Sequence, residues 1–391
     1  MPQPTPLRDL AARAAPWLAL AVVLAVEAAH MRTEAPMCGG VCTMLEQARA
    51  YTHGGDPWTG RTMDGVQPAC PTGISAMYTP ASLWLLSPLA DHLGAVCDVW
   101  RGVQLVAYGV ALAAAASLLP CWRRRVAMLA LVLWVRGWLG DPLFRDSMTG
   151  NVASLEAAGV WTVAALGARS RWWSLVAVAF VTGIQKQVYW ALAAIPLLAR
   201  RARATLAGLG AMVALHLTMW TFDAHGYAKW LTQARAHDER GLIHPALRSL
   251  SHDLTEAWGA PACTSDLPWI AVCLAVGGLL WWGSRRAPQQ VATGRGMLWV
   301  VLSYLAVTPY LKDYTLVMAV PAVAATLAWV HPAAALAVVA VQVLGGELGG
   351  YHALAVIWAA LLALVWREGR RAFQGATATG PGSPASPSAR S

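Results

Sequence analysis

Four carboxylates fall within one polar stretch of the chain, residues 32–78, where they could act on a bound hydroxyl. They are Glu34, Glu46, Asp56 and Asp64. A carboxylate held against a hydroxyl can take its proton as a general base, and Asp56 lies at a Gly-Gly-Asp-Pro turn sequence. Glu46, Glu34 and Asp56 are therefore candidate catalytic residues, with a solvated loop charge as the alternative for each.

Three cysteines share this stretch: Cys38, Cys42 and Cys70. If the stretch lies outside the cytoplasm, a disulfide between two of them is chemically permitted. A zinc site needs several His or thiolate ligands at tight spacing, and His53 is the one histidine nearby. We therefore predict a disulfide and no metal site.

Lys186 is a charged residue inside an apolar stretch, residues 174–199, where it lies between Gln185 and Gln187. An ammonium within a bilayer costs a few kcal/mol unless it faces water or a counter-charge. Two interpretations remain open. Lys186 binds an anionic group such as a lipid phosphate in a polar cavity, or it lies at the tip of a short hairpin.

A second polar interruption, Lys312-Asp313, lies between two apolar segments. It is a candidate substrate-binding pair, and self-neutralisation of a loop pair is the alternative. Asp141, Asp146 and Asn151 form one further polar connection.

The elements that must position these residues are apolar helices. The chain is 57% hydrophobic and 13% charged, whereas soluble domains are about one quarter charged. Lipid offers no partner to an exposed peptide group, so helices are the expected spanning elements. We predict an all-α transmembrane bundle of about nine to twelve spans. The apolar segments are 14–31, 79–93, 99–119, 126–140, 151–168, 174–199, 204–222, 267–283, 296–311, 314–330, 333–345 and 351–366.

The net charge of +9 comes from short arginine clusters between apolar segments. Basic loops stay in the cytoplasm, so membrane orientation explains the charge better than a nucleic-acid partner does. The clusters include 123–125, 169–171, 200–203, 285–286 and 367–371. Placing both 123–125 and 169–171 inside requires that two apolar segments do not span. The candidates are 79–93, lying at the interface, and 174–199, forming two half-helices that meet in a V. Alternatively every segment spans, and some arginines lie outside.

This orientation places both long polar loops, residues 32–78 and 223–266, on the extracytoplasmic face. We expect one transmembrane domain over residues 1–371, with an uncleaved first span, and a disordered cytoplasmic tail over 372–391, which is rich in Gly, Ala, Pro and Ser. The expected location is the plasma (inner) membrane. Most of the tryptophans form an aromatic belt, and Trp58 and Trp84 are candidates for stacking on a sugar.

Several short patterns follow one another along the chain, among them Gly55-Asp56-Pro57-Trp58 and Tyr78-Thr79-Pro80. The full set is 46–50, 55–58, 78–80, 149–152, 183–186, 245–250 and 308–314. Their order resembles the GT-C class of polyprenyl-phosphate-dependent glycosyltransferases, in particular the mannosyltransferase-like family 87, which has a first outer loop with Asp-Phe-x-x-Tyr, then Gly-Asp-Pro-Tyr, then Tyr-Pro-Pro. The similar segments cover most of the chain, from about residue 40 to residue 330.

The resemblance implies an inverting hexosyltransferase with the lipid bilayer, a lipid-linked sugar donor and a lipid or glycan acceptor as partners. No cofactor is expected, because the donor sugar is carried on a lipid phosphate. A carboxylate of the first loop would deprotonate the acceptor hydroxyl. The lipid phosphate or substrate would be bound by Lys186, Tyr78, Lys312, Asp313 and Tyr314.

Two positions depart from the family pattern: the catalytic Asp is replaced by Gly40, and the His by Tyr314. Either Glu34 or Glu46 serves instead, or the chain keeps the fold without the reaction. A membrane transporter or flippase for a lipid-linked or anionic substrate is the alternative from another class. Transporters commonly carry two matching broken segments, and the Gln-Lys-Gln interruption has no second copy.

Overall fold

The computed structural model describes residues 6–33, 39–58, 78–90, 96–241, 266–308 and 313–329. Within these ranges every regular element is a helix, so the all-α prediction is confirmed for the described part of the chain. Several predictions lie outside the described residues: those on Glu34, Cys38, Asp64, Cys70, Lys312, the apolar segments 333–345 and 351–366, and the tail 372–391. Most of the second polar loop, residues 242–265, also lies outside them.

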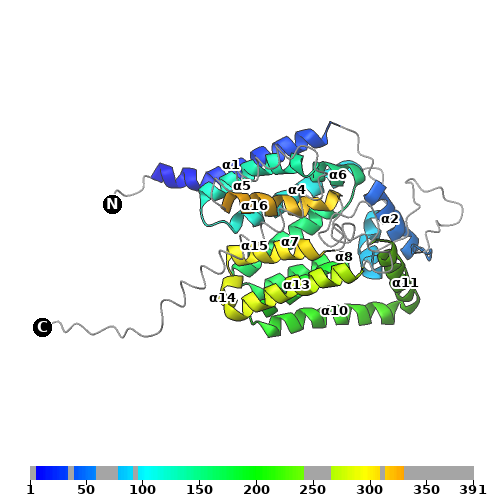
Figure 1. Cartoon of the computed structure of the whole chain (residues 1–391). Coiled ribbons are helices and arrows are strands. Elements are labelled where there is room, and N and C mark those ends of the chain that lie inside the picture. Colours follow the sequence, from blue (N-terminus) through cyan, green and yellow to red (C-terminus); the bar gives the residue numbers. More distant parts are fainter. Residues whose placement is uncertain are drawn as a thin grey trace.

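The body of the molecule is a bundle of roughly parallel and antiparallel helices (Figure 1). α4 packs against α7, α16 against α5, and α7 against α8, so helices distant in sequence share one core. The long members are α1 (Pro6–Met31), α4 (Val96–Ser117), α5 (Trp122–Trp138), α7 (Ala153–Ala168), α8 (Trp172–Gln185), α10 (Ala202–Phe222), α13 (Asp266–Arg286), α15 (Gly294–Val307) and α16 (Ala319–Trp329).

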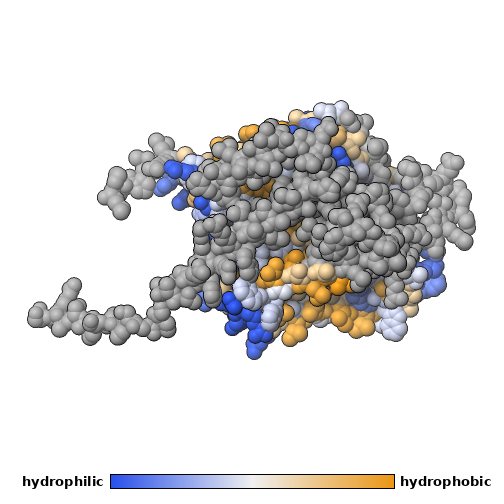
Figure 2. All heavy atoms as spheres, viewed as in Figure 1, coloured by the Kyte–Doolittle hydropathy of each residue, from blue (hydrophilic) through white to orange (hydrophobic). Residues whose placement is uncertain are grey.

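Three described helices are long and apolar enough to cross a membrane: Asp9–Met31, Val96–Ser117 and Ala202–Phe222. α5 and α6 (Pro142–Thr149) would add a fourth if this pair, bent by 65°, counts as one span. Their outer faces carry large apolar side chains, such as Leu18 and Leu206. Figure 2 shows such side chains over the lower part of the molecule, where α10 and α13 lie. An apolar exterior of this extent suits contact with lipid.

The segment 174–199 is broken at Lys186, as predicted. α8 ends at Gln185, and the chain returns through the 3₁₀ helix η2 (Gln187–Ala194) and α9 (Ile195–Leu198). A Cβ on Gly208 of α10 would contact both Val176 of α8 and Ala193 of η2, so the two arms lie at the same level. The break therefore forms a hairpin with Lys186 at its turn.

The first polar stretch also contributes short helices. α2 (Gly39–Thr52) and α3 (Pro80–Leu86) pack against each other, and α11 (Ala224–Gly241) contacts α3. α3 has seven residues and would cover only about 10 Å at 1.5 Å per residue. By itself it is too short to cross a bilayer, and an interfacial position for residues 79–93 stays a prediction.

α2, α6 and α11 lie at one end of the bundle, and α14 (Pro288–Val291) lies at the other (Figure 1). We call the end with α2, α6 and α11 the polar end. We call the opposite end, where Arg200, Arg285 and Arg295 lie at or beside helix termini, the basic end. Arg200 Nη2 donates to the Arg285 carbonyl at 2.9 Å, and the Arg295 guanidinium lies 5.2 Å from the Trp329 ring centroid. Gly294 is packed against the Leu118 carbonyl. The ends of α4, α9, α13 and α16 and the start of α15 therefore meet at the basic end.

Candidate functional site

The two polar stretches are joined by a pair of side-chain contacts at the polar end. The Asp56 carboxylate lies 2.5 Å from Lys229 Nζ, and the Tyr51 hydroxyl donates to Asp223 Oδ2 at 3.0 Å. Burial, reinforced by the Asp223 carboxylate, raises the pKa of Tyr51, so its hydroxyl stays a donor at neutral pH. Residues 170 or more positions apart in sequence thus form one surface.

Buried aromatic side chains lie beneath these contacts. Trp58 and Trp230 are each 3% exposed and pack with Ala48 and Leu83. The Trp58 indole is therefore part of the core and does not present a face for a sugar. Trp84, on α3, is 59% exposed, so of the two tryptophans considered for stacking it is the accessible one.

The first polar stretch is also tied to the hairpin that carries Lys186. Thr79 Oγ1 and Ser82 Oγ both donate to the Ile184 carbonyl, at 3.1 and 2.6 Å. Thr79 additionally caps α3 by accepting from the Ser82 amide at 3.1 Å. Thr79 and Ser82, at the start of α3, thus contact the chain two residues before Lys186.

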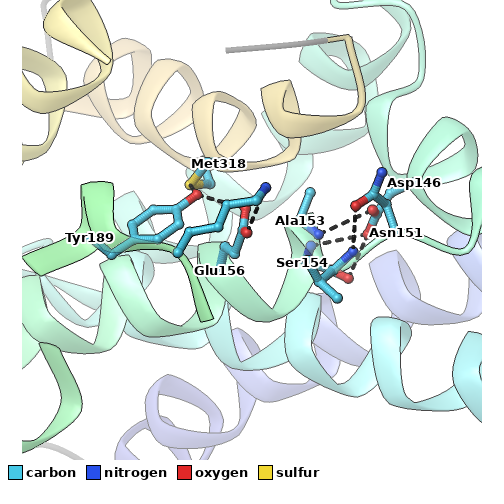
Figure 3. A network of polar contacts seen from close by, with 9 residues as sticks. Asp146, Asn151, Ala153, Ser154, Glu156, Tyr189 and Met318 are labelled. Atoms are coloured by element: carbon cyan, nitrogen blue, oxygen red, sulfur yellow. Dashed lines mark hydrogen bonds and ion pairs between the residues drawn. The ribbon is translucent and has the colours of Figure 1, made fainter. Parts of the chain in front are cut away.

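Lys186 is paired with a carboxylate that the sequence interpretation had not singled out. Its Nζ lies 2.9 Å from Glu156 Oε1, and the Glu156 side chain is fully buried. The Tyr189 hydroxyl donates to Glu156 Oε2 at 2.6 Å and lies 3.8 Å from Met318 Sδ (Figure 3). Lys186 lies at a hairpin turn, as one interpretation held, and it has the counter-charge that the other required.

A second buried carboxylate, Asp146, holds the start of α7 in place. It accepts from the amides of Ala153 and Ser154, at 3.2 and 3.0 Å, and from the Ser154 hydroxyl at 2.7 Å (Figure 3). The Gln104 amide donates to the Asn151 carbonyl at 2.8 Å. These bonds satisfy orphan donors at the helix start, so this polar connection has a structural role.

A cavity of about 470 Å³ lies between α7 and α8, beside Glu156. Its polar lining residues are Glu156, Thr162, Thr182 and Gln185. Such a volume falls in the usual range of small-molecule pockets, about 300–1,000 Å³. The remaining lining residues are apolar or small: Leu155, Ala158, Gly159, Ala177, Val178 and Val181.

Gly40, which the resemblance aligns with a catalytic Asp, has no room for a side chain. A Cβ there would lie 2.8 Å from the Thr149 carbonyl oxygen and 3.0 Å from that of Gly150. The start of α2 therefore packs backbone to backbone against the end of α6. Glu46, one of the two proposed substitutes, is half-buried on α2.

Of the other predicted binding residues, the structure describes Tyr78 and the backbone of Asp313 and Tyr314. Tyr78 accepts through its carbonyl from Trp58 Nε1 at 3.3 Å. The backbone of Asp313 and Tyr314 opens the 3₁₀ helix η4 (Asp313–Met318), and their side chains lie outside the description. The structure thus brings Asp56 and Tyr78 to the polar end.

Cysteine chemistry differs between the two ends. Cys42, on α2, and Cys97, on α4, are both disulfide-bonded, whereas Cys121 beside the basic end is free and exposed. Cys42 was one of the three cysteines predicted to form a disulfide, and Cys97 was not.

Three candidate functional residues were not identified from the sequence: Glu156, Lys229 and Asp223. Glu156 carried a usable signal, because an ionisable residue within an apolar segment marks a functional position by default. Lys229 and Asp223 lie in a polar stretch with many charges, where no pattern distinguishes them. Lys186, Lys229 and Lys312 are the only lysines of the chain.

Among the described residues, no three His, Cys, Asp or Glu side chains lie close enough together to hold a metal ion. Comparison with protein-family models, with curated proteins and with solved structures found no match to this chain.

Proposed function

We propose that this protein is a multi-pass membrane glycosyltransferase that moves a hexose from a polyprenyl-phosphate donor to a lipid or glycan acceptor at the outer face of the plasma membrane. One observation carries the proposal. The two polar stretches meet at one end of an apolar bundle, beside a hairpin whose turn bears the Lys186–Glu156 pair.

The arrangement suits a reaction at the membrane surface. Transfer forms a bond between an acceptor oxygen and the anomeric carbon and breaks the bond from that carbon to the phosphate oxygen. It therefore needs a base for the acceptor hydroxyl and a cation for the leaving phosphate. In this proposal Lys186 meets the phosphate, and Asp56 or Glu46 supplies the base.

The two ends of the bundle support the orientation. Arginine clusters favour the cytoplasmic side, and disulfides persist in oxidising compartments. Arg200, Arg285 and free Cys121 lie at or beside the basic end, and disulfide-bonded Cys42 belongs to α2 at the other. The polar end, with the proposed reaction site, would then face outward.

The test is a transfer assay on the full chain in nanodiscs, with radiolabelled polyprenyl-phosphate-linked hexoses and membrane-lipid acceptors. Lys186→Met should lower transfer by about 10²–10³, the usual loss when one group stabilising developing charge is removed. Asp56→Asn and Glu46→Gln identify the base. Asp98→Asn is the matched control, because Asp98 is exposed at the start of α4.

Absence of transfer by the wild-type protein across several donor sugars would refute the proposal. Movement of a lipid-linked sugar across proteoliposomes without transfer would instead identify a flippase. Equal transfer by Lys186→Met and wild type would remove Lys186 from the phosphate role.

A further inference from the structure

We infer that the basic end binds the phosphate of an anionic phospholipid between the start of α10 and the end of α13. Two separate loops bring five arginines together there, and we call this group the arginine cluster. It consists of Arg200, Arg201 and Arg203 at the start of α10, and of Arg285 and Arg286 in the last turn of α13. Lipid binding at this site requires neither sugar transfer nor a particular orientation of the bundle.

The folded chain holds the two parts of the arginine cluster against each other. Arg200 Nη2 donates to the Arg285 carbonyl at 2.9 Å, across 85 positions of sequence, and all five arginines are exposed. Orientation in a membrane requires only that basic residues lie in the loops of one side. Bringing two basic loops together adds like-charge repulsion, which a bound anion would relieve.

The arginine cluster lacks protein counter-charges in the described part of the chain. No described carboxylate forms an ion pair with Arg200, Arg201, Arg203 or Arg285. The first turn of α10 also holds no acidic residue. Since the helix dipole is positive at an N-terminus, Arg201 and Arg203 lie where an anion lowers the electrostatic energy.

Backbone amides at the start of α10 add hydrogen-bond donors to this charge. Ala204 and Thr205 both donate to the Arg201 carbonyl, at 3.0 and 3.4 Å, and the Arg201 side chain makes no capping bond. The amides of Ala202 and Arg203 also belong to the first turn, where helical amides have no partner within the helix. A phosphate can accept both from such amides and from guanidinium groups.

Apolar side chains continue from the arginine cluster along both helices. Trp281, one turn before Arg285, is exposed, and the Arg285 guanidinium lies 5.0 Å from its ring centroid. Leu206 on α10 and Leu279 on α13 are exposed, and a Cβ on Gly278 would meet nothing within 4 Å. Figure 2 shows hydrophilic side chains at this end directly beside the apolar surface of α10 and α13. A lipid would cover that surface with its acyl chains, whereas a soluble phosphate compound would leave it bare.

The shortage of carboxylates also selects the class of lipid. Phosphatidylcholine and phosphatidylethanolamine carry an ammonium group beside the phosphate. That ammonium would meet Arg201, Arg203 and Arg285, which no described carboxylate balances. Phosphatidylglycerol carries the phosphate without a positive charge, so it suits the arginine cluster better.

The test is native mass spectrometry of the full chain in a neutral detergent, with phosphatidylglycerol or phosphatidylcholine of the same acyl chains at equal concentration. We expect wild type to retain more phosphatidylglycerol. The double variant Arg201→Gln with Arg203→Gln should weaken its binding roughly thirtyfold, because two basic residues that attract the anionic head group are lost. Binding of phosphatidylcholine should not change.

Two further variants separate the arginine cluster from general charge and from misfolding. Arg13→Gln with Arg123→Gln removes the same charge from exposed positions on α1 and α5, on the other side of the bundle, and should retain most of the binding. Arg201→Lys with Arg203→Lys keeps the charge at the site and should restore most of it.

Equal retention of the two lipids by wild type would overturn the inference, as would an equal loss of binding in the α1 and α5 variant. Displacement of phosphatidylglycerol by inorganic phosphate or by a single-stranded oligonucleotide at the same concentration would show a site for a soluble anion and would refute the lipid assignment.

Discussion

Charged side chains make different contacts at the basic end and at the polar end of this bundle. At the basic end Arg200, Arg201 and Arg285 are exposed, and their guanidinium groups reach backbone carbonyls, rings or solvent. Near the polar end Lys186 is opposed by a fully buried carboxylate, and Lys229 lies 2.5 Å from Asp56. Charge at the basic end is suited to the membrane surface, and charge at the polar end to a reaction site.

Net charge alone is a poor guide to where chemistry lies in this chain. The chain carries 29 basic residues, of which only three are lysines, and both lysines whose side chains are described are paired with carboxylates near the polar end. A lysine is a compact point charge on a flexible stem, whereas arginine is a rigid fork. Lys186 and Lys229 are therefore the cations to examine first.

The largest expected effect is on chemical labelling from the two sides of the membrane. A membrane-impermeant amine reagent should label Lys229 in intact spheroplasts, because the polar end is proposed to face outward. An impermeant maleimide should reach Cys121 only after permeabilisation. Peptide mass spectrometry identifies the sites, with Lys229→Arg and Cys121→Ser as controls, and the reverse pattern would invert the proposed orientation.

The second largest expected effect is on stability, where removing a buried charge should cost more free energy of unfolding than removing an exposed one. Glu156→Ala should lower the free energy of unfolding by about 3 kcal/mol, because it leaves the Lys186 ammonium without its counter-charge. Arg201→Gln, at the basic end, should change it by less than about 0.5 kcal/mol. Thermal unfolding in detergent, followed by tryptophan fluorescence, measures both.

The double variant Glu156→Gln with Lys186→Met checks the reason for this loss. It removes both charges, so it should recover most of the stability lost in Glu156→Ala. If the double variant is as unstable as Glu156→Ala, packing rather than charge is responsible.

Backbone packing predicts that alanine substitutions at two glycines change the free energy of unfolding in opposite directions. Gly40→Ala should destabilise the protein by about 1–3 kcal/mol, because the added Cβ overlaps the Thr149 and Gly150 carbonyls. Gly102→Ala, on α4 with open space around it, should stabilise by about 0.5–1 kcal/mol through helix propensity. The same unfolding assay compares them, and destabilisation of equal size by both would contradict the tight contact at Gly40.

The smallest effect concerns the Tyr51–Asp223 hydrogen bond. The pKa of Tyr51 is raised in the folded state, so its contribution to stability is fully present below the ordinary tyrosine pKa of about 10. It is lost as the pH rises through the folded-state pKa. Tyr51→Phe should cost about 1 kcal/mol at pH 7.

A pH series of unfolding measurements tests the sign of this linkage. The stability difference between wild type and Tyr51→Phe should be constant from pH 6 to pH 9 and should shrink only in more alkaline solution. A difference that grows with pH in that neutral range would contradict the assignment of Tyr51 as the donor.

Local patterns predicted local structure well. Long apolar runs indicated helices, and the polar interruption at Lys186 marked a chain reversal. The same reasoning missed Glu156, although an ionisable residue within an apolar segment is itself a signal of function. It also placed Trp58 among the sugar-stacking candidates, although the folded chain buries that ring.

Among the segments similar to family 87, those with Asp56 and Tyr78 lie at the polar end, and the Lys186 hairpin is hydrogen-bonded to α3 there. The close backbone contact at Gly40 leaves no room for a carboxylate side chain at that position.

The sequence by itself determined the helical character, the apolar exterior and the arginine clusters, because hydrophobicity and charge act locally along the chain. Only the tertiary structure decided that Lys186 meets Glu156, 30 positions earlier, and that Asp56 meets Lys229. Such pairs depend on how helices pack and on how far each rotates about its axis. An apolar run without a polar face does not specify that rotation, so the pairing of its rare charged residues appears only in the folded chain.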